Sequence, residues 1–189
     1  MGLLSTLFGS NRLKKANREQ YFAITTASIS FEGREDIHIT DSAGLVFNPV
    51  ESSFFATLDT EIRDLMNIST RETGSTFEIK TDEFGTRWVV VHDPDFEDLV
   101  TTLHMIGEVI TDHGFGDRLL AAVFRIDFEG ARAYWVYNIK RGRYYPLVLK
   151  GDRQRDNHAE MRLGTMMEKE KLPVEPTLEQ WYALWGIPF

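Results

Sequence analysis

Three consecutive segments in the second half of the chain predict an antiparallel meander. Residues 118–127, 131–139 and 144–149 are separated by two short turns, 128–130 and 140–143. Such short connections can join only antiparallel neighbours, because a parallel crossover needs about a dozen residues or more. One face of the meander is expected to be core, because apolar side chains fall in step on two neighbouring strands: Ala122, Phe124, Ile126, Ala133, Trp135, Tyr137 and Ile139.

A second hairpin is predicted upstream of the meander. Residues 76–80 and 87–92 flank a turn in which Gly85 is available for positive φ. A further short strand is predicted over 44–50, ending at Pro49. The stretch 30–42 is polar and predicts no particular element.

The best-defined helix is predicted to follow Asp93. This residue is expected to be the N-cap, Pro94 fits the first helical position, and Gly114 is placed to end the helix. Residues 11–27 and 158–171 predict two more helices. Another helix, capped by Ser52 or Ser53, is predicted because five apolar residues recur at helical spacing: Phe55, Leu58, Ile62, Leu65 and Met66.

The order of these elements predicts one α+β domain over residues 1–189. Strands and helices do not alternate strictly, which argues against a doubly wound parallel sheet. We therefore expect a mainly antiparallel sheet of five or six strands with helices packed on it. Residues 172–189 form an aromatic tail with two of the four tryptophans, and we expect Trp181, Leu184 and Trp185 to dock on the body.

The first 18 residues predict an N-terminal hook. Leu3, Leu4, Leu7 and Phe8 precede a basic cluster that runs from Arg12 to Arg18. Such a hook is suited to touch a membrane surface or a partner protein, and the alternative is that it packs on its own domain. No stretch approaches the roughly 20 apolar residues of a membrane span, so we expect a cytoplasmic protein, either free or peripheral at the inner face of the membrane.

Charge is distributed unevenly along an acidic chain. The formal net charge is −8, yet ten of the 21 Lys and Arg residues lie in 1–20 and 140–155. We predict that the second segment binds an acidic protein partner; anionic lipid headgroups and the ordinary charge of a turn and loop are the alternatives. Nucleic acid is not expected, because phosphate repulsion would act on most of the molecule. The predicted partner-binding residues are Lys140, Arg141, Arg143, Lys150, Arg153 and Arg155.

Catalytic, cofactor and metal motifs are not evident. The chain has no cysteine, and its five histidines lack HExxH spacing. Acidic residues between Asp93 and Asp98 suit the first turn of a helix, where capping and the helix dipole account for them. We therefore expect no catalytic, cofactor-binding or metal-binding residues and no enzyme activity. The competing hypothesis is an enzyme or small-ligand sensor assembled from dispersed residues such as His92, His104 or Asp117.

An ordered series of short motifs resembles the PspAB family of PspA-associated proteins. The motifs are Met1–Leu4, Gly44–Glu51, Thr81–Trp88, Glu97–His104, Gly114–Gly116, Lys140–Pro146, Arg155–Asn157, Leu172–Pro176 and Trp185–Pro188. The resemblance implies a role in the phage-shock envelope-stress response, with a PspA-like protein or an HtpX-type membrane protease as partner. The element order is also similar to small chaperone-like domains of the secretion-chaperone or YbjN kind, which bind other proteins. No catalytic residues are implied.

Overall fold

The computed structural model describes residues 4–49, 60–64, 66–67, 74–151 and 153–189, with side chains described from Arg18 onward. It is an α+β domain with a seven-stranded antiparallel sheet, which confirms the predicted fold class. The strand order is β2-β3-β1-β4-β5-β6-β7. The strands are β1 (Ile37–Phe47), β2 (Thr76–Thr81), β3 (Arg87–His92), β4 (Leu119–Phe128), β5 (Ala131–Asn138), β6 (Arg143–Gly151) and β7 (Gln154–Arg155). The number of strands exceeds the expected five or six partly because of β7. This strand has only two residues, too few to show the alternation of apolar and polar side chains that predicts a strand.

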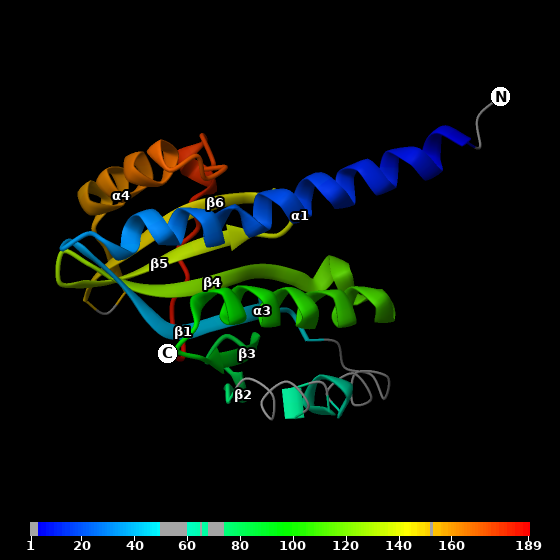
Figure 1. Cartoon of the computed structure of the whole chain (residues 1–189). Helices are drawn as coiled ribbons and strands as arrows, with labels where there is room; N and C mark the ends of the chain where they lie inside the picture. Colours follow the sequence, from blue (N-terminus) through cyan, green and yellow to red (C-terminus); the bar gives the residue numbers. More distant parts are fainter. Residues whose placement is uncertain (1–3, 50–59, 65, 68–73, 152) are drawn as a thin grey trace.

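Helices cover one face of this sheet and one of its edges (Figure 1). The helix α1 (Leu4–Glu32) runs beside α3 (Phe96–Ile110) over the sheet, and α4 (Asn157–Lys169) lies along β6. After α3 the chain makes a π-turn, η1 (Thr111–Phe115), and a 3-10 turn, η2 (Gly116–Arg118); a second 3-10 turn, η3 (Leu178–Gln180), lies in the C-terminal tail. Residues 60–64 and 66–67 are helical, with Ile62 and Met66 buried, while the other predicted positions of that helix lie outside the described residues.

The first helix and the first strand are longer than predicted. The expected helix over 11–27 extends to Glu32, because Ile24, Ala27 and Phe31 continue one buried seam along α1. The strand β1 starts at Ile37, seven residues before the predicted 44–50 strand. Its register against β4 shifts between Ile39 and Ala43, so the polar residues of this irregular stretch hide the period-2 pattern.

The N-cap of α3 is Asp95 and not Asp93 as predicted. The Asp95 carboxylate accepts hydrogen bonds from the backbone N–H groups of Glu97 and Asp98. Asp93 is buried, accepts from the Asp95 N–H at 2.8 Å and from the hydroxyl of Ser75, and so fixes the turn before the helix. At the other end, Gly114 has φ 83° and breaks the helical path, although α3 itself already ends at Ile110.

The C-terminal tail lies against the sheet face opposite α1 and α3 (Figure 1). The ring of Phe189 lies 6.0 Å from Trp88 and 6.1 Å from Tyr134, and a Cβ on Gly44 would lie 2.6 Å from that ring. Trp181 is buried and its indole N–H donates to the carbonyl of Glu175 at 2.8 Å. Leu184 is half-buried against the core. Phe189 thus gives the sheet a partial cover on its second face, whereas Trp181 lies next to Gly164 of α4.

Candidate functional site

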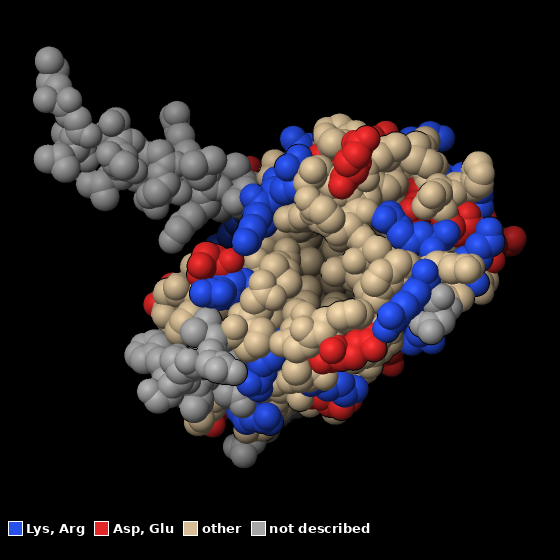
Figure 2. All heavy atoms as spheres, turned by 180° about the vertical axis from the view of Figure 1, so that it is seen from behind, with Lys and Arg blue, Asp and Glu red and all other residues tan. Residues whose placement is uncertain are grey.

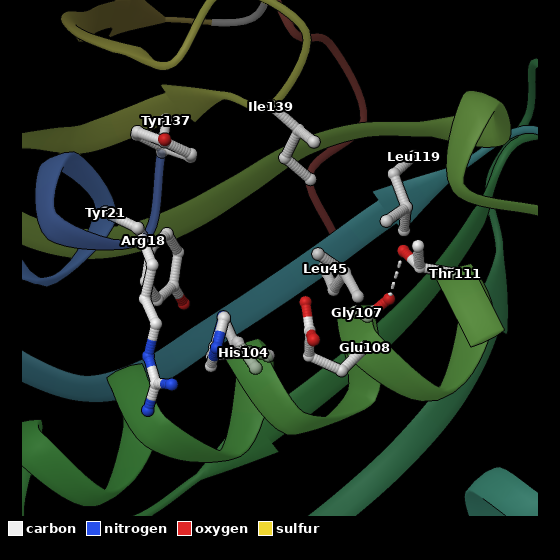
Figure 3. Close-up of a pocket in the computed structure, with 11 residues that line it drawn as sticks. Arg18, Tyr21, Leu45, His104, Gly107, Glu108, Thr111, Leu119, Tyr137 and Ile139 are labelled. Atoms are coloured by element: carbon white, nitrogen blue, oxygen red, sulfur yellow. Dashed lines mark hydrogen bonds between the residues drawn. The ribbon is translucent and has the colours of Figure 1, made fainter. Parts of the chain in front are cut away.

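A pocket of about 400 Å³ opens between α1 and α3, above the ends of β1, β4 and β5 (Figure 3). Its floor is apolar and comes from four separate parts of the chain: Leu45, Leu103, Leu119 and Ile139. Tyr21 and Tyr137 form an aromatic wall, and Arg18, His104 and Glu108 stand at the rim. A concave apolar site with a few polar groups is the usual form of a binding pocket.

Helix periodicity brings the α3 residues to the pocket. Leu103, His104, Gly107, Glu108 and Thr111 recur at three- and four-residue spacing, so they share one face of the helix and its C-terminal end. Thr111 donates its hydroxyl hydrogen to the carbonyl of Gly107 at 2.8 Å, which keeps that polar group away from the apolar floor. Gly107 leaves room because it has no side chain.

Buried hydrogen bonds hold the aromatic wall. The hydroxyl of Tyr21 donates to the carbonyl of Val100 at 2.9 Å, and the hydroxyl of Tyr144 donates to the carbonyl of Tyr21. Burial raises the pKa of Tyr21 and of Tyr144 well above the ordinary value, and it raises the pKa of Tyr137 to about 12. All three phenols are therefore neutral at pH 7, and the wall is preformed.

The rim groups carry no ion pair among the described residues. Arg18 lies over the ring of Phe22, 5.7 Å from its centroid, and both Arg18 and Glu108 are exposed. His104 packs edge-on against Phe22 and near Tyr21, with ring centroids 5.0 and 5.5 Å away. Burial lowers the pKa of His104, so its ring is neutral at pH 7. The rim therefore carries a positive, a neutral and a negative side chain, those of Arg18, His104 and Glu108, which can contact a ligand.

Four of the six predicted partner-binding cations are paired within the chain. Arg141 donates to both carboxylate oxygens of Glu175, and Arg155 does the same to Glu160, with both of its contacts at 2.8 Å. Glu175 and Glu160 are each only 2% exposed, so these two arginines offset buried charge. The other two pairs are Lys150 with Asp156 at 3.4 Å and Arg153 with Glu83 at 2.6 Å.

Lys140 and Arg143 have no ion pair in the part of the chain that the structure describes. Both belong to the β5–β6 hairpin, and Lys140 directly follows Ile139 of the pocket floor. The described residues also form no broad basic area in the view from behind, where Lys and Arg are interspersed with Asp and Glu around a hollow with uncharged walls (Figure 2). The charge separation in the sequence is therefore reduced by pairing in the folded chain.

The dispersed residues that the sequence singled out for chemistry do not meet in one place. His104 lines the pocket, whereas the Nδ1 of His92 lies 2.9 Å from the hydroxyl of Ser42, and Asp117 lies in η2. No group of three His, Asp or Glu side chains suited to a metal occurs among the described residues. The pocket itself was not predicted from the sequence; its one readable signal was Gly107, a glycine in the interior of a helix.

Fold and site together define an α+β protein with a preformed apolar pocket between two helices. The family model for PspA associated protein B matches residues 1–189, and the chain therefore belongs to that family. This membership confirms the resemblance drawn from the motifs and gives the chain a role in the PspA system. No curated protein matches the chain.

A match among solved structures corrects one expectation. The matched protein is a phage S-adenosylmethionine lyase in complex with S-methyl-5′-thioadenosine; the match is 12% identical, covers 58% of this chain and 89% of that chain, and has a TM-score of 0.26. The expectation that the chain is not an enzyme is withdrawn on this finding. A likeness at this TM-score provides no argument for an activity or a shared fold. Within the described residues, no helix has the length and apolar character needed to cross a membrane.

Proposed function

We propose that this chain is a partner-binding accessory protein of the PspA system. It engages an acidic protein surface through the end of the sheet that carries the β5–β6 hairpin and the pocket rim. PspA itself is the first candidate partner, because the matching family model is described as PspA associated protein B. An HtpX-type membrane protease is the second candidate, and it follows only from the family resemblance.

The unpaired cations at this end are the observation that supports the proposal most. Lys140 on the hairpin and Arg18 on α1 are exposed, and Arg143, at the start of β6, is half-buried; none of the three has an ion pair among the described residues. A cation that is not neutralised within its own chain can attract an acidic partner and lose that attraction as salt rises. The paired arginines of the same segment contribute to folding instead.

The test compares two double charge reversals by calorimetric titration with PspA of the same organism. Lys140→Glu with Arg143→Glu should weaken binding by about tenfold or more, because two attractive contacts become repulsive. The control is Arg34→Glu with Arg132→Glu, which changes the net charge equally at the opposite end of the sheet. Arg34 is paired with Asp36 at 2.8 Å, but both side chains are exposed, so loss of that pair costs little stability. Binding by this control should stay close to that of the wild type. Equal effects of the two pairs would remove the hairpin from the mechanism.

Arg141 is not used in this test although it belongs to the predicted segment. Reversing its charge would place a carboxylate against buried Glu175, whose pKa is lowered chiefly by the hydrogen bond from Arg141. Such a variant would lose stability and binding together. Lys140 and Arg143 avoid this ambiguity.

A further inference from the structure

Gly107 of α3 lines the pocket and places no side chain in it. A Cβ at this position would lie 3.9 Å from Leu119 and 4.0 Å from Leu45, which is ordinary van der Waals contact. Packing therefore does not require glycine here, and the residue lies within the regular helix. Glycine in a helix interior costs about 1 kcal/mol relative to alanine. Glycine therefore lowers the stability of this helix without a packing reason, which is typical of a residue with a functional role.

The two helices that flank the pocket carry opposite charges. Arg18 stands on α1 and Glu108 on α3, with neutral His104 between them (Figure 3). Neither charged group has an ion pair among the described side chains, so they do not neutralise one another. Both are exposed at the rim, where a small ligand would leave them in water, whereas a protein element lying across the opening would cover them.

We propose that the pocket receives the apolar side of an amphipathic helix from the partner protein. This inference rests on the proposed function and names the element that the partner supplies. Apolar side chains at i, i+3 or i+4 and i+7 enter the pocket, as in other helix-in-groove complexes. An acidic residue on one flank of that helix faces Arg18, and a basic residue on the other flank faces Glu108. The opposite charges of the walls fix the direction in which the helix lies.

A plugging variant tests the occupancy of the pocket. Gly107→Leu fills the space with a side chain that suits a helix, and Gly107→Ala is the matched control that leaves most of the space open. With PspA of the same organism as the probe, Gly107→Leu should weaken binding by about tenfold or more, as expected for loss of a central apolar anchor. Gly107→Ala should bind within about threefold of the wild type, a difference of well under 1 kcal/mol.

Two results would count against the inference in different ways. Unchanged binding by Gly107→Leu would overturn the pocket as the docking place and leave the proposed function intact. Failure of the wild-type chain to bind PspA at all would overturn the proposed function and this inference with it. The uncharged dye N-phenyl-1-naphthylamine gives a second readout: PspA should displace dye bound by the wild type, and dye that stays bound beside PspA would also overturn the inference.

A charge exchange tests the direction of the helix. Arg18→Glu combined with Glu108→Arg keeps the net charge and reverses the polarity of the groove. Binding of PspA should fall by about tenfold or more, because both flanking contacts become repulsive. Unchanged binding would show that no oriented helix lies between these two residues. Both side chains are exposed, so the melting temperature should change little and loss of fold should not obscure the result.

Discussion

At the residue scale, His104 and His113 differ in their environments although both belong to the α3 and η1 stretch. The ring of His104 is partly buried among aromatic side chains, and burial lowers its pKa. The Nδ1 of His113 lies 2.8 Å from the carbonyl of Val109, and its Nε2 lies 2.9 Å from Glu61. These contacts, with the Val109 hydrogen bond the largest, raise the pKa of His113.

The two histidines should therefore titrate on opposite sides of the ordinary value of about 6.5. Protonated His113 stabilises the fold below that value, and this contribution is lost as pH rises through its raised folded-state pKa. The buried site of His104 favours the neutral ring. Its contribution to the free energy of unfolding is therefore present above about pH 6.5 and is lost as pH falls through the lowered pKa of the folded state. Imidazole chemical shifts followed by NMR against pH would measure both. Titration of His104 at or above His113 would contradict the environments described.

The basic segment 140–155 shows that a sequence does not reveal which of its charged residues pair within the folded chain. Six cations between 140 and 155 predict one binding surface, but Arg141 is paired with Glu175, which is 34 residues away along the chain. Arg155 pairs with Glu160, and its guanidinium also donates to the carbonyl of Trp181. Which cations remain for a partner depends on these tertiary contacts. The folded chain narrows the predicted set to Lys140 and Arg143, and their role stays a prediction.

At the element scale, the outer edge of β6 is covered along most of its length. The N–H of Tyr144 donates to the carbonyl of Pro173 at 2.9 Å, and the N–H of Glu175 donates to the carbonyl of Tyr144 at 2.8 Å. Further along, the N–H of Val148 donates to the carboxylate of Glu160 at 3.0 Å. One buried side chain thus takes the place of a neighbouring strand, which protects this edge from pairing with another chain.

Removal of the Glu160 carboxylate should weaken this edge strongly. Glu160→Ala leaves the Val148 N–H without its acceptor and the Arg155 guanidinium without its carboxylate, at a cost of about 3 kcal/mol in the free energy of unfolding. Glu160→Gln keeps one acceptor oxygen and should cost less. Urea denaturation of both variants would measure the order, and equal stability of Glu160→Ala and the wild type would contradict the role given to this carboxylate.

Docking of the C-terminal tail depends on glycine at two contact points. A Cβ on Gly44 would lie 2.6 Å from the Phe189 ring, and one on Gly164 would lie 2.8 Å from the Trp181 ring. Gly44→Ala should therefore destabilise the protein by about 1 to 3 kcal/mol and expose the tail to limited proteolysis. Gly107→Ala is the control, because its Cβ has room and should raise stability by up to about 1 kcal/mol. Equal behaviour of the two variants would argue against docking of Phe189.

The elements that the sequence predicted well are those with regular periodicity and clear turns. Residues 76–80, 87–92 and the three segments of the meander correspond to β2 to β6 within about two residues at most ends. The strand β1 was largely missed, because its irregular register at Ile39 to Ala43 breaks the alternation and leaves polar residues inside it. The extra turn of α1 was missed because Ser28 and Ser30 make the end of that helix look polar.

At the scale of the whole molecule, the pocket could not be predicted because five elements build it. Arg18, Leu45, His104, Leu119 and Ile139 come from α1, β1, α3, β4 and the residue after β5. No spacing rule relates residues so far apart in the sequence. The same folding places the pocket rim and the β5–β6 hairpin at one end of the sheet. That arrangement joins the proposed electrostatic contact and the proposed helix groove into one surface.

The affinity of the chain for PspA at several salt concentrations is the sharpest test of the proposed partner-binding role. Titration calorimetry should give saturable binding that weakens between about 0.05 and 0.3 M salt, because exposed charges are screened over roughly 10 Å at 0.1 M. In the Lys140→Glu and Arg143→Glu variant, binding should be weaker, and added salt should relieve repulsion instead of removing attraction. Absence of binding, or an affinity that neither salt nor this variant changes, would contradict a partner-binding role for this end of the molecule.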